Sequence, residues 1–143
     1  MRPAHPGHEE CPCELIWERA DLAIASNPAG HELRVGGSGE WEADRLFSLA
    51  LQSALMSSFV ARAERAGIHL LGYMSSGNLR PAGAGGQDRE LVLAPCVVVE
   101  AEAEREAAWS ILHQAAADSH LCRLLGEGLV LTPHIVATSP SPG

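Results

Sequence analysis

The stretch that decides the fold is Arg45–Gly67, RLFSLALQSALMSSFVARAERAG. Wound as a helix, it is apolar over most of its circumference, so the sequence predicts a long helix that is buried on several sides. Acidic residues at positions 42–44 suit the positive end of the helix dipole, and Gly67 suits its C-terminal cap. The centre, QSALMSS at 52–58, carries small and polar residues instead. The question is whether a reactive residue belongs there.

Composition and charge limit the classes of function. The chain has 143 residues, which suits one domain with its own core. Hydrophobic residues make up 46% and charged residues 20%, as in a soluble globular protein. The net charge is −8, all ten basic residues are Arg, and they are scattered along the chain. Nucleic-acid binding needs a clustered basic surface, so we expect no nucleic-acid partner.

The sequence also argues against export and membrane insertion. Residues 1–13 contain no apolar segment of the kind found in signal peptides. The longest apolar stretch, Leu46–Ala61, is too short and too interrupted by serines to span a membrane. The four cysteines show no spacing typical of a disulfide framework. We therefore expect a cytoplasmic protein with reduced thiols and no membrane partner.

The segments before the long helix predict an arm and a small sheet. Residues 1–13 are rich in Pro and predict a flexible N-terminal arm. Residues 14–36 show the apolar and alternating patterns of strands around the turn residues 27–30. They predict a strand hairpin, or a short meander if the chain breaks near Arg19.

The segments after the long helix predict strands on both sides of a second helix. Strands are expected at 69–81 and 90–103, and Pro95 demotes the second of these to an edge, a bulge or a bend. A second helix is expected from about Glu102 to Leu125, and a last strand at 129–138. Grouped strands without regular strand–helix–strand repeats predict an α+β fold.

The long helix also predicts an oligomer. A helix that is apolar nearly all round needs more cover than one small sheet provides, so we expect a homodimer that buries it. The domain itself is expected to span residues 14–137, followed by a disordered tail at 138–143.

The stretch ADRLF at 43–47, with Ala54 ten residues after Asp44, and the stretch SHLC at Ser119–Cys122 resemble motifs of one family. That family is the OsmC/Ohr proteins (osmotically inducible protein C and organic hydroperoxide resistance). In that family the first helix starts with Pro-Glu-x-Leu-Leu/Phe, and a reactive Cys follows ten residues after the Glu. Residues 43–47 (ADRLF) stand at this motif, and Ala54 stands ten residues after Asp44. The family's second Cys lies in a Cys-Pro-x-Ser pattern, which corresponds to SHLC at Ser119–Cys122. The resemblance covers roughly residues 14–137.

The resemblance implies a fold and a chemistry. Family members are intertwined homodimers in which antiparallel sheets from both chains wrap around two long central helices. Active members reduce organic hydroperoxides with the first Cys as nucleophile and the second as resolving thiol. An Arg from the first strand region and the Glu at the helix start activate the nucleophile. The corresponding residues are Arg19 and Asp44, and without a thiol between them we expect a salt bridge.

The resemblance therefore implies that the two-cysteine mechanism is absent. Position 54 is Ala and position 119 is Ser, and an unactivated serine hydroxyl is a poor nucleophile at neutral pH. We expect a non-catalytic relative without a cofactor, with a ligand-binding or a stress-related role. It is expected to keep an apolar pocket for a small apolar, thiol-containing or hydroperoxide ligand. The residues expected to line that pocket are Leu55, Met56, Trp109 and Leu112.

Two alternatives remain open. Cys122 could act as the thiol of an atypical hydroperoxide reductase if Arg19 or His120 favours its thiolate; otherwise it is a small buried hydrophobe, as we also expect for Cys96. The N-terminal arm could bind a metal ion, because its residues include metal-ligand types, although their spacing matches no standard zinc pattern. These arm residues are His5, His8, Cys11 and Cys13.

Overall fold

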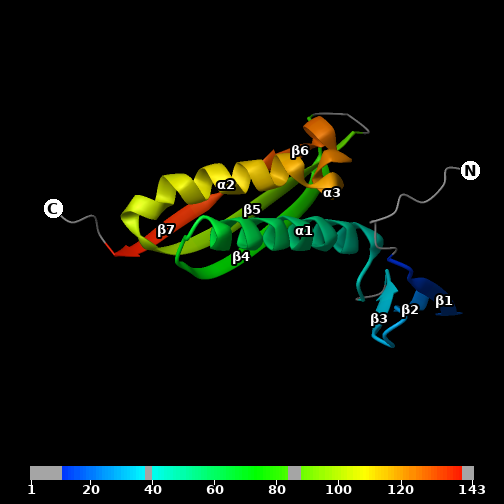
Figure 1. The fold of residues 1–143 in the computed structure, drawn as a ribbon. Coiled ribbons are helices and arrows are strands. Elements are labelled where there is room, and N and C mark those ends of the chain that lie inside the picture. The colour runs from blue at the N-terminus through cyan, green and yellow to red at the C-terminus, as the bar shows by residue number, and fades with distance from the viewer. Residues whose placement is uncertain (1–10, 38–39, 84–87, 140–143) are drawn as a thin grey trace, which may run out of the picture. The chain divides into compact units, whose positions relative to one another are not determined.

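The structure is a computed structural model, and it describes residues 11–37, 40–83 and 88–139 (Figure 1). The chain divides into two compact units, residues 1–43 and residues 44–143, and each is described by itself. In its described residues the first unit contains strands, up to Ala43 at the start of the first helix. The second contains the helices and a second sheet, so the α+β prediction is confirmed.

The first unit is an antiparallel meander of three strands. These are β1 (Glu14–Arg19), β2 (Leu22–Ser26) and β3 (Glu32–Gly36), with β2 in the middle. The first strand ends at Arg19 and a turn follows, so of the two predicted arrangements, hairpin and meander, the meander is confirmed. The register shifts between Trp17 and Arg19, and Ala20 adopts a positive φ of 47°. The Trp17 indole N–H donates to the Ala20 carbonyl at 2.8 Å and holds this turn.

This meander has almost no core of its own. Leu22 and Ala23 are its buried hydrophobic residues, whereas every residue of β1 is exposed. Leu15, Ile16 and Trp17 are 67%, 63% and 70% exposed within the single chain. A three-stranded sheet with so little buried apolar surface is not stable alone.

The long helix is α1 (Ala43–Arg65), and it begins and ends where the sequence predicts. Gly67 adopts a φ of 73°, and the Ile68 N–H reaches back to the Ala63 carbonyl at 3.0 Å. Within one chain the helix buries a single stripe, not several sides. The stripe consists of Ser48, Leu51, Leu55, Phe59 and Ala63.

Apolar side chains are also exposed on both sides of this stripe, Phe47 on one side and Leu49 and Met56 on the other. Phe47, Leu49 and Met56 are 39%, 44% and 40% exposed in the single chain. Of the helices in the described part of the chain, α1 is the one long and apolar enough to cross a membrane by length and composition. Core helices of soluble proteins meet the same criteria, and one stripe of α1 does lie in the core.

The second sheet is built around one long central strand. β4 (Leu70–Pro81) pairs antiparallel with β5 (Arg89–Ala101), whereas β6 (Leu129–Leu131) and β7 (His134–Ser139) both pair parallel with β5. The sheet is therefore mixed. β7 extends two residues beyond the predicted end of the domain at 137.

Pro95 lies on the central strand of this sheet, so of the three predicted arrangements, an edge, a bulge or a bend, the edge is wrong. β6 pairs with residues 91–93 of β5, and β7 pairs from Cys96 onward. Between them Thr132 and Pro133 interrupt the predicted last strand, which is therefore split in two. A proline is tolerated at position 95 because the parallel ladder is already broken beside it.

The predicted second helix, 102–125, is also divided. A 3-10 turn, η1 (Glu102–Glu104), precedes α2 (Arg105–Asp118), and the chain then becomes extended at Ser119. A short α3 (His120–Arg123) and a second 3-10 turn, η2 (Gly126–Gly128), lead into β6. The helical pattern of apolar residues continues through Ser119 in the sequence, although the backbone is not helical at this residue.

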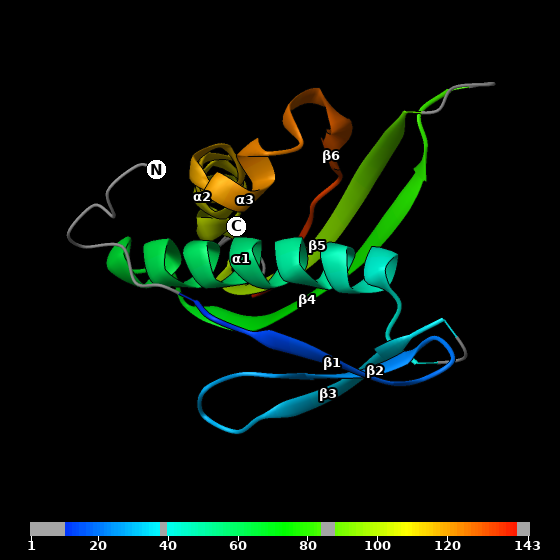
Figure 2. The ribbon, with the colours of Figure 1, turned by 90° about the vertical axis from the view of Figure 1, so that its right-hand side faces the viewer.

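The core of the second unit lies between one face of the sheet and the two long helices. Figure 2 views α2 end-on and shows α1 and α2 beside β4 and β5. Residues 91, 93, 97 and 99 of β5 are buried against Leu51, Leu55 and Phe59 of α1 and against Leu112 of α2. Alternate residues of β5 face away from the helices, as the two-residue period of a strand requires.

Candidate functional site

The centre of α1 carries no thiol. Ala54 is half-buried, its neighbour Leu55 fills the core, and Ser53 and Ser57 are exposed. A methyl group at position 54 with neutral hydroxyl groups beside it provides no thiolate nucleophile.

A polar bridge between α1 and β4 accounts for the small and polar residues of this helix. The Gln52 amide lies 2.7 Å from the Ser75 hydroxyl and 3.2 Å from the Ser48 hydroxyl. When the nitrogen of the Gln52 amide faces Ser75, the amide oxygen also accepts a hydrogen bond from the Gly77 N–H at 3.2 Å. We call Ser48, Gln52, Ser75 and Gly77 the polar bridge. Sequence reasoning missed it; its only signal is the Ser-Gln pair four residues apart on the buried side of the helix.

Gly77 allows this close approach. A Cβ atom at position 77 would collide with the Ser48 hydroxyl and would lie 2.6 Å from the nearest atom of the Gln52 amide group. At this point α1 therefore contacts β4 through polar groups. Larger apolar side chains here would hold the helix and the strand further apart. The centre of α1 has a structural role that requires small residues.

Ser119 is a helix cap. Its N–H donates to the Ala115 carbonyl at 3.0 Å and so closes α2, while its hydroxyl accepts from the Cys122 N–H at 3.4 Å and so opens α3. The residue is buried, and its polar groups are satisfied by these bonds. The break between α2 and α3 therefore has a definite cause, because Ser is among the preferred residues at an N-cap.

Cys122 forms part of the wall of a hollow at the C-terminal end of α2. The thiol residue is 2% exposed, as expected for a small buried hydrophobe. The hollow has a volume of about 390 Å³. Small and apolar residues of α2, η2 and β6 form most of its lining, together with His113 and Arg123.

The interior next to Cys122 disfavours negative charge. Burial raises the pKa of Tyr73 to about 12, with Coulombic repulsion from Cys122 as the second cause. The Tyr73 hydroxyl is buried and has no hydrogen-bond partner in the described part of the chain. Its ring lies against Phe59, with 5.7 Å between ring centroids.

Solved structures share this arrangement of elements. An OsmC-like protein of unknown function from Vibrio cholerae superposes with a TM-score of 0.72 at 15% identity, over 90% of this chain and 100% of that one. The fold is OsmC-like. An OsmC-like protein from Mycoplasma pneumoniae gives 0.72 at 8% identity, over 92% of this chain and 99% of that one. The organic hydroperoxide resistance protein OhrB of Bacillus subtilis gives 0.63 at 9% identity, over 89% and 98%.

At the level of sequence, no family model and no curated protein matches the chain. The similarity to OsmC-like structures is therefore one of fold. Roles for individual residues do not follow from it.

The OsmC-like fold places Arg19 and Asp44 in different units of the chain, so their predicted salt bridge stays a prediction. Within the first unit, Arg19 lines a hollow of about 280 Å³ together with Arg34, Asp21 and Glu40. Arg34 pairs with Glu40 at 3.4 Å. This hollow is polar and charged, in contrast to the hollow beside Cys122.

The predicted pocket of Leu55, Met56, Trp109 and Leu112 is wrong for the single chain. Leu55 and Leu112 fill the core, whereas Met56 and Trp109 are 40% and 50% exposed. The reason is helical geometry, because neighbours such as 55 and 56 point about 100° apart. His113 stacks on Trp109 with 3.8 Å between ring centroids, and His120 is exposed.

The metal-binding hypothesis for the N-terminal arm stays a prediction. His5 and His8 lie outside the described residues, and Cys11 and Cys13 are exposed. Within residues 11–37, 40–83 and 88–139, no three His, Cys, Asp or Glu side chains form a group that could hold a metal ion.

Proposed function

We propose that this protein is a non-catalytic homodimer with the OsmC-like fold that binds a small apolar molecule instead of reducing hydroperoxides. One observation carries the proposal. The two positions at which the family resemblance expects thiols hold a methyl group, at Ala54, and a hydroxyl group committed to capping a helix, at Ser119. We place the protein in the reducing cytoplasm, where its free thiols persist.

Hydroperoxide reduction makes demands that these residues do not meet. A thiolate must attack the O–O bond, which releases an alcohol and leaves a sulfenic acid on the attacking sulfur. A second thiol then attacks the sulfenic acid, forms a disulfide and releases water. An alanine at the first position removes the sulfur that both steps need.

Exposed apolar surface supports the homodimer. On α1, Phe47 is exposed on one side of the buried stripe and Leu49 and Met56 on the other, and in the first unit Leu15 and Trp17 are exposed as well. Monomeric proteins rarely expose apolar patches of this kind. A second copy of the chain supplies matching apolar surfaces for both.

The hollow beside Cys122 is the binding site that we propose. Its apolar lining includes Ala116, Leu129 and Leu131, which suit an aliphatic chain. Arg123 lies on the same hollow and has no ion pair within the described residues. An aliphatic molecule with a carboxylate would use both features.

A second candidate function rests on the same hollow. Cys122 contributes to its wall next to His113 and Arg123, so a hydroperoxide bound there would lie close to a thiol. This candidate is an atypical hydroperoxide reductase with a single cysteine.

Steady-state consumption of cumene hydroperoxide with a dithiol reductant distinguishes the two candidates. For the non-catalytic protein we expect wild type and Cys122→Ser to match the rate of the reductant alone. Turnover by wild type that is lost in Cys122→Ser would establish the reductase and overturn the main proposal.

Calorimetric titration with decanoate tests the binding site. We expect wild type to bind, and Arg123→Gln to bind more weakly, because the carboxylate loses its charged partner. Arg105→Gln, an exposed Arg away from the hollow, serves as the control. A wild type that releases no heat of binding, or an unchanged affinity in Arg123→Gln, would contradict the assignment.

A further inference from the structure

The face of the second sheet that points away from the helices carries Cys96. Along β5, residues 91, 93, 95, 97 and 99 are buried, and the residues between them are half-buried on the opposite face. Cys96 is one of these half-buried residues, so its expected place in the core is wrong. The cause is the strand period, which separates Cys96 from its buried neighbours Pro95 and Val97.

The strand register places two further soft donors beside this thiol. Met74 on β4 is the partner of Cys96 in the antiparallel ladder, and His134 on β7 is its partner in the parallel ladder. The next pairs, Tyr73 with Val97 and Val97 with Ile135, point into the core, so Met74, Cys96 and His134 share the outer face. We call these three residues the outer row.

The spacing of the outer row suits a shared ligand. Paired residues on adjacent strands have Cβ atoms roughly 4.5–5.5 Å apart, with the thiol in the middle of the row. Met74 is 71% exposed, and His134 is exposed. No hydrogen bond or ion pair engages the Cys96 thiol or the His134 ring within the part of the chain that the structure describes. All three donor groups are therefore available.

The surroundings of the outer row are uncharged. Its neighbours on the same face are Ser76 paired with Ala94, and Val98 paired with Gly72 and Val136. Glu100 lies four residues along β5 from Cys96, a distance of about 13 Å along a strand. Among the described residues of this sheet, no carboxylate therefore lies next to the row to supply the hard oxygen ligands that Mg²⁺ or Ca²⁺ prefers.

We propose that Met74, Cys96 and His134 form a binding site for a soft monovalent metal ion, Cu(I). A thiolate, a thioether and an imidazole are the ligands that Cu(I) selects. One thiolate neutralises one monovalent charge, which suits an uncharged surface, and the thiol proton is released when the metal binds. Zn²⁺ normally takes four N, S or O ligands and is not bound by thioethers. This site is separate from the N-terminal arm and does not depend on the proposed function.

The test is an anaerobic competition between the protein and the chromophoric Cu(I) complex of bicinchoninate. The full chain with Cys11→Ser and Cys13→Ser is the starting protein, because it removes the exposed thiols of the arm. We expect it to withdraw one Cu(I) per chain. Cys96→Ser should abolish binding, and Met74→Leu and His134→Gln should each weaken it by roughly tenfold or more, the scale on which even outer-shell partners affect metal sites.

Matched variants keep the proposal falsifiable. Met56→Leu, His120→Gln and Cys122→Ser change the same residue types elsewhere and should leave the Cu(I) affinity unchanged. X-ray absorption of the loaded protein should show two sulfur ligands and one nitrogen ligand. Binding that survives Cys96→Ser would overturn the site, as would Cu(I) affinity that is insensitive to both Met74→Leu and His134→Gln.

Discussion

At the scale of single residues, Gly77 determines how closely α1 approaches β4. The absence of a side chain there leaves room for the Ser48 hydroxyl and the Gln52 amide against the strand. The same residues explain the small and polar centre of α1 without any reactive group. Their role is to satisfy one another's hydrogen bonds in a partly buried position.

Gly77→Ala should destabilise the protein by about 1–3 kcal/mol, because the added methyl group displaces the Ser48 hydroxyl and the Gln52 amide from their hydrogen bonds. The measurement is the midpoint of urea unfolding. Gly72→Ala on the same strand is the control, because its Cβ would meet Val98 at an ordinary 3.7 Å. Equal effects of the two variants would contradict the close approach at Gly77.

Tyr73 gives a spectroscopic prediction, because it is the only tyrosine in the chain. Burial raises its pKa in the folded protein to about 12, against 10.0 for the free side chain. The neutral phenol is thus favoured by folding, and its contribution to stability is present below pH 10 and is lost as the pH rises through about 12. Ultraviolet titration of phenolate should show the high midpoint in buffer and the ordinary midpoint in urea. A midpoint near 10 in the folded protein would contradict the burial of this hydroxyl.

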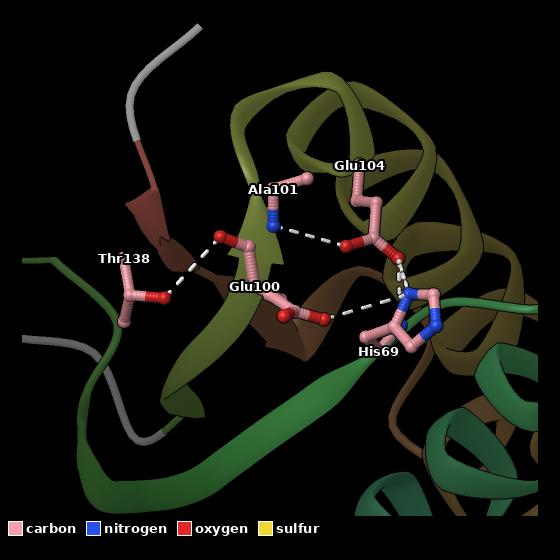
Figure 3. A network of polar contacts seen from close by, with 5 residues as sticks. All are labelled: His69, Glu100, Ala101, Glu104 and Thr138. Atoms are coloured by element: carbon pink, nitrogen blue, oxygen red, sulfur yellow. Dashed lines mark hydrogen bonds and ion pairs between the residues drawn. The ribbon is translucent and has the colours of Figure 1, made fainter.

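At the scale of elements, Glu104 ties the start of α2 to the start of β4 (Figure 3). Its carboxylate accepts from the His69 N–H at 2.6 Å and from the Ala101 N–H at 3.0 Å. The His69 ring lies 3.2 Å from the same carboxylate and 3.9 Å from that of Glu100. Two loop connections are thereby joined through one side chain.

This clamp predicts a contribution of Glu104 to acid stability. The backbone N–H groups of His69 and Ala101 lower the pKa of Glu104 in the folded state. The contribution of Glu104 to the free energy of unfolding is therefore fully present above the ordinary pKa of Glu. It is lost as the pH falls through the lower pKa that Glu104 has in the folded state.

Glu104→Gln should lower the urea midpoint of unfolding at neutral pH. In this variant the midpoint should also decrease less than in wild type when the pH is lowered. Glu106→Gln, at an exposed position in the first turn of α2, should leave both properties unchanged. The measurement is urea unfolding at a series of pH values between neutrality and strong acid. Identical pH profiles for wild type and Glu104→Gln would contradict the clamp.

Elements could be predicted where the signal is local. Gly67 ends α1 and the chain breaks beside Arg19, because positive φ values and turn residues act within a few positions. The break at Ser119 was missed because the apolar period continues across it, and the serine was interpreted from the family motif instead. Its hydroxyl acts through a cap, which the sequence does not distinguish from an ordinary polar residue.

The missed parts of the candidate sites depend on contacts between segments far apart in the chain. Gln52 meets Ser75, and Cys96 meets both Met74 and His134, only through the packing of α1 and the register of the sheet. A shift of one residue in register would place these side chains on opposite faces. The alternation of apolar residues indicates which face of a strand each residue takes, but it does not identify the residue that lies opposite on a neighbouring strand.

At the scale of the whole molecule, the proposed homodimer gives a direct prediction. The mass in solution should be twice the 15.1 kDa of one chain, and the unfolding midpoint should rise with protein concentration. Leu49→Asp places a charge at an exposed apolar position of α1 and should weaken the dimer. Leu124→Asp, at a 77% exposed position on the end of α3, should not. Analytical ultracentrifugation checks both, and a monomeric wild type at micromolar concentration would contradict the dimer.

The central claim is that this chain keeps an OsmC-like fold without its thiol chemistry. Its most direct test is a single exposure of the protein to cumene hydroperoxide, followed by trapping with dimedone and peptide mapping by mass spectrometry. This measurement does not depend on choosing the correct reductant. We predict that the peptide containing Cys122 stays unmodified. We also predict that the amount of alcohol formed from cumene hydroperoxide does not exceed the amount formed in buffer alone. Rapid formation of a dimedone adduct on Cys122, with one alcohol released per adduct, would contradict the claim and assign the protein to the hydroperoxide reductases.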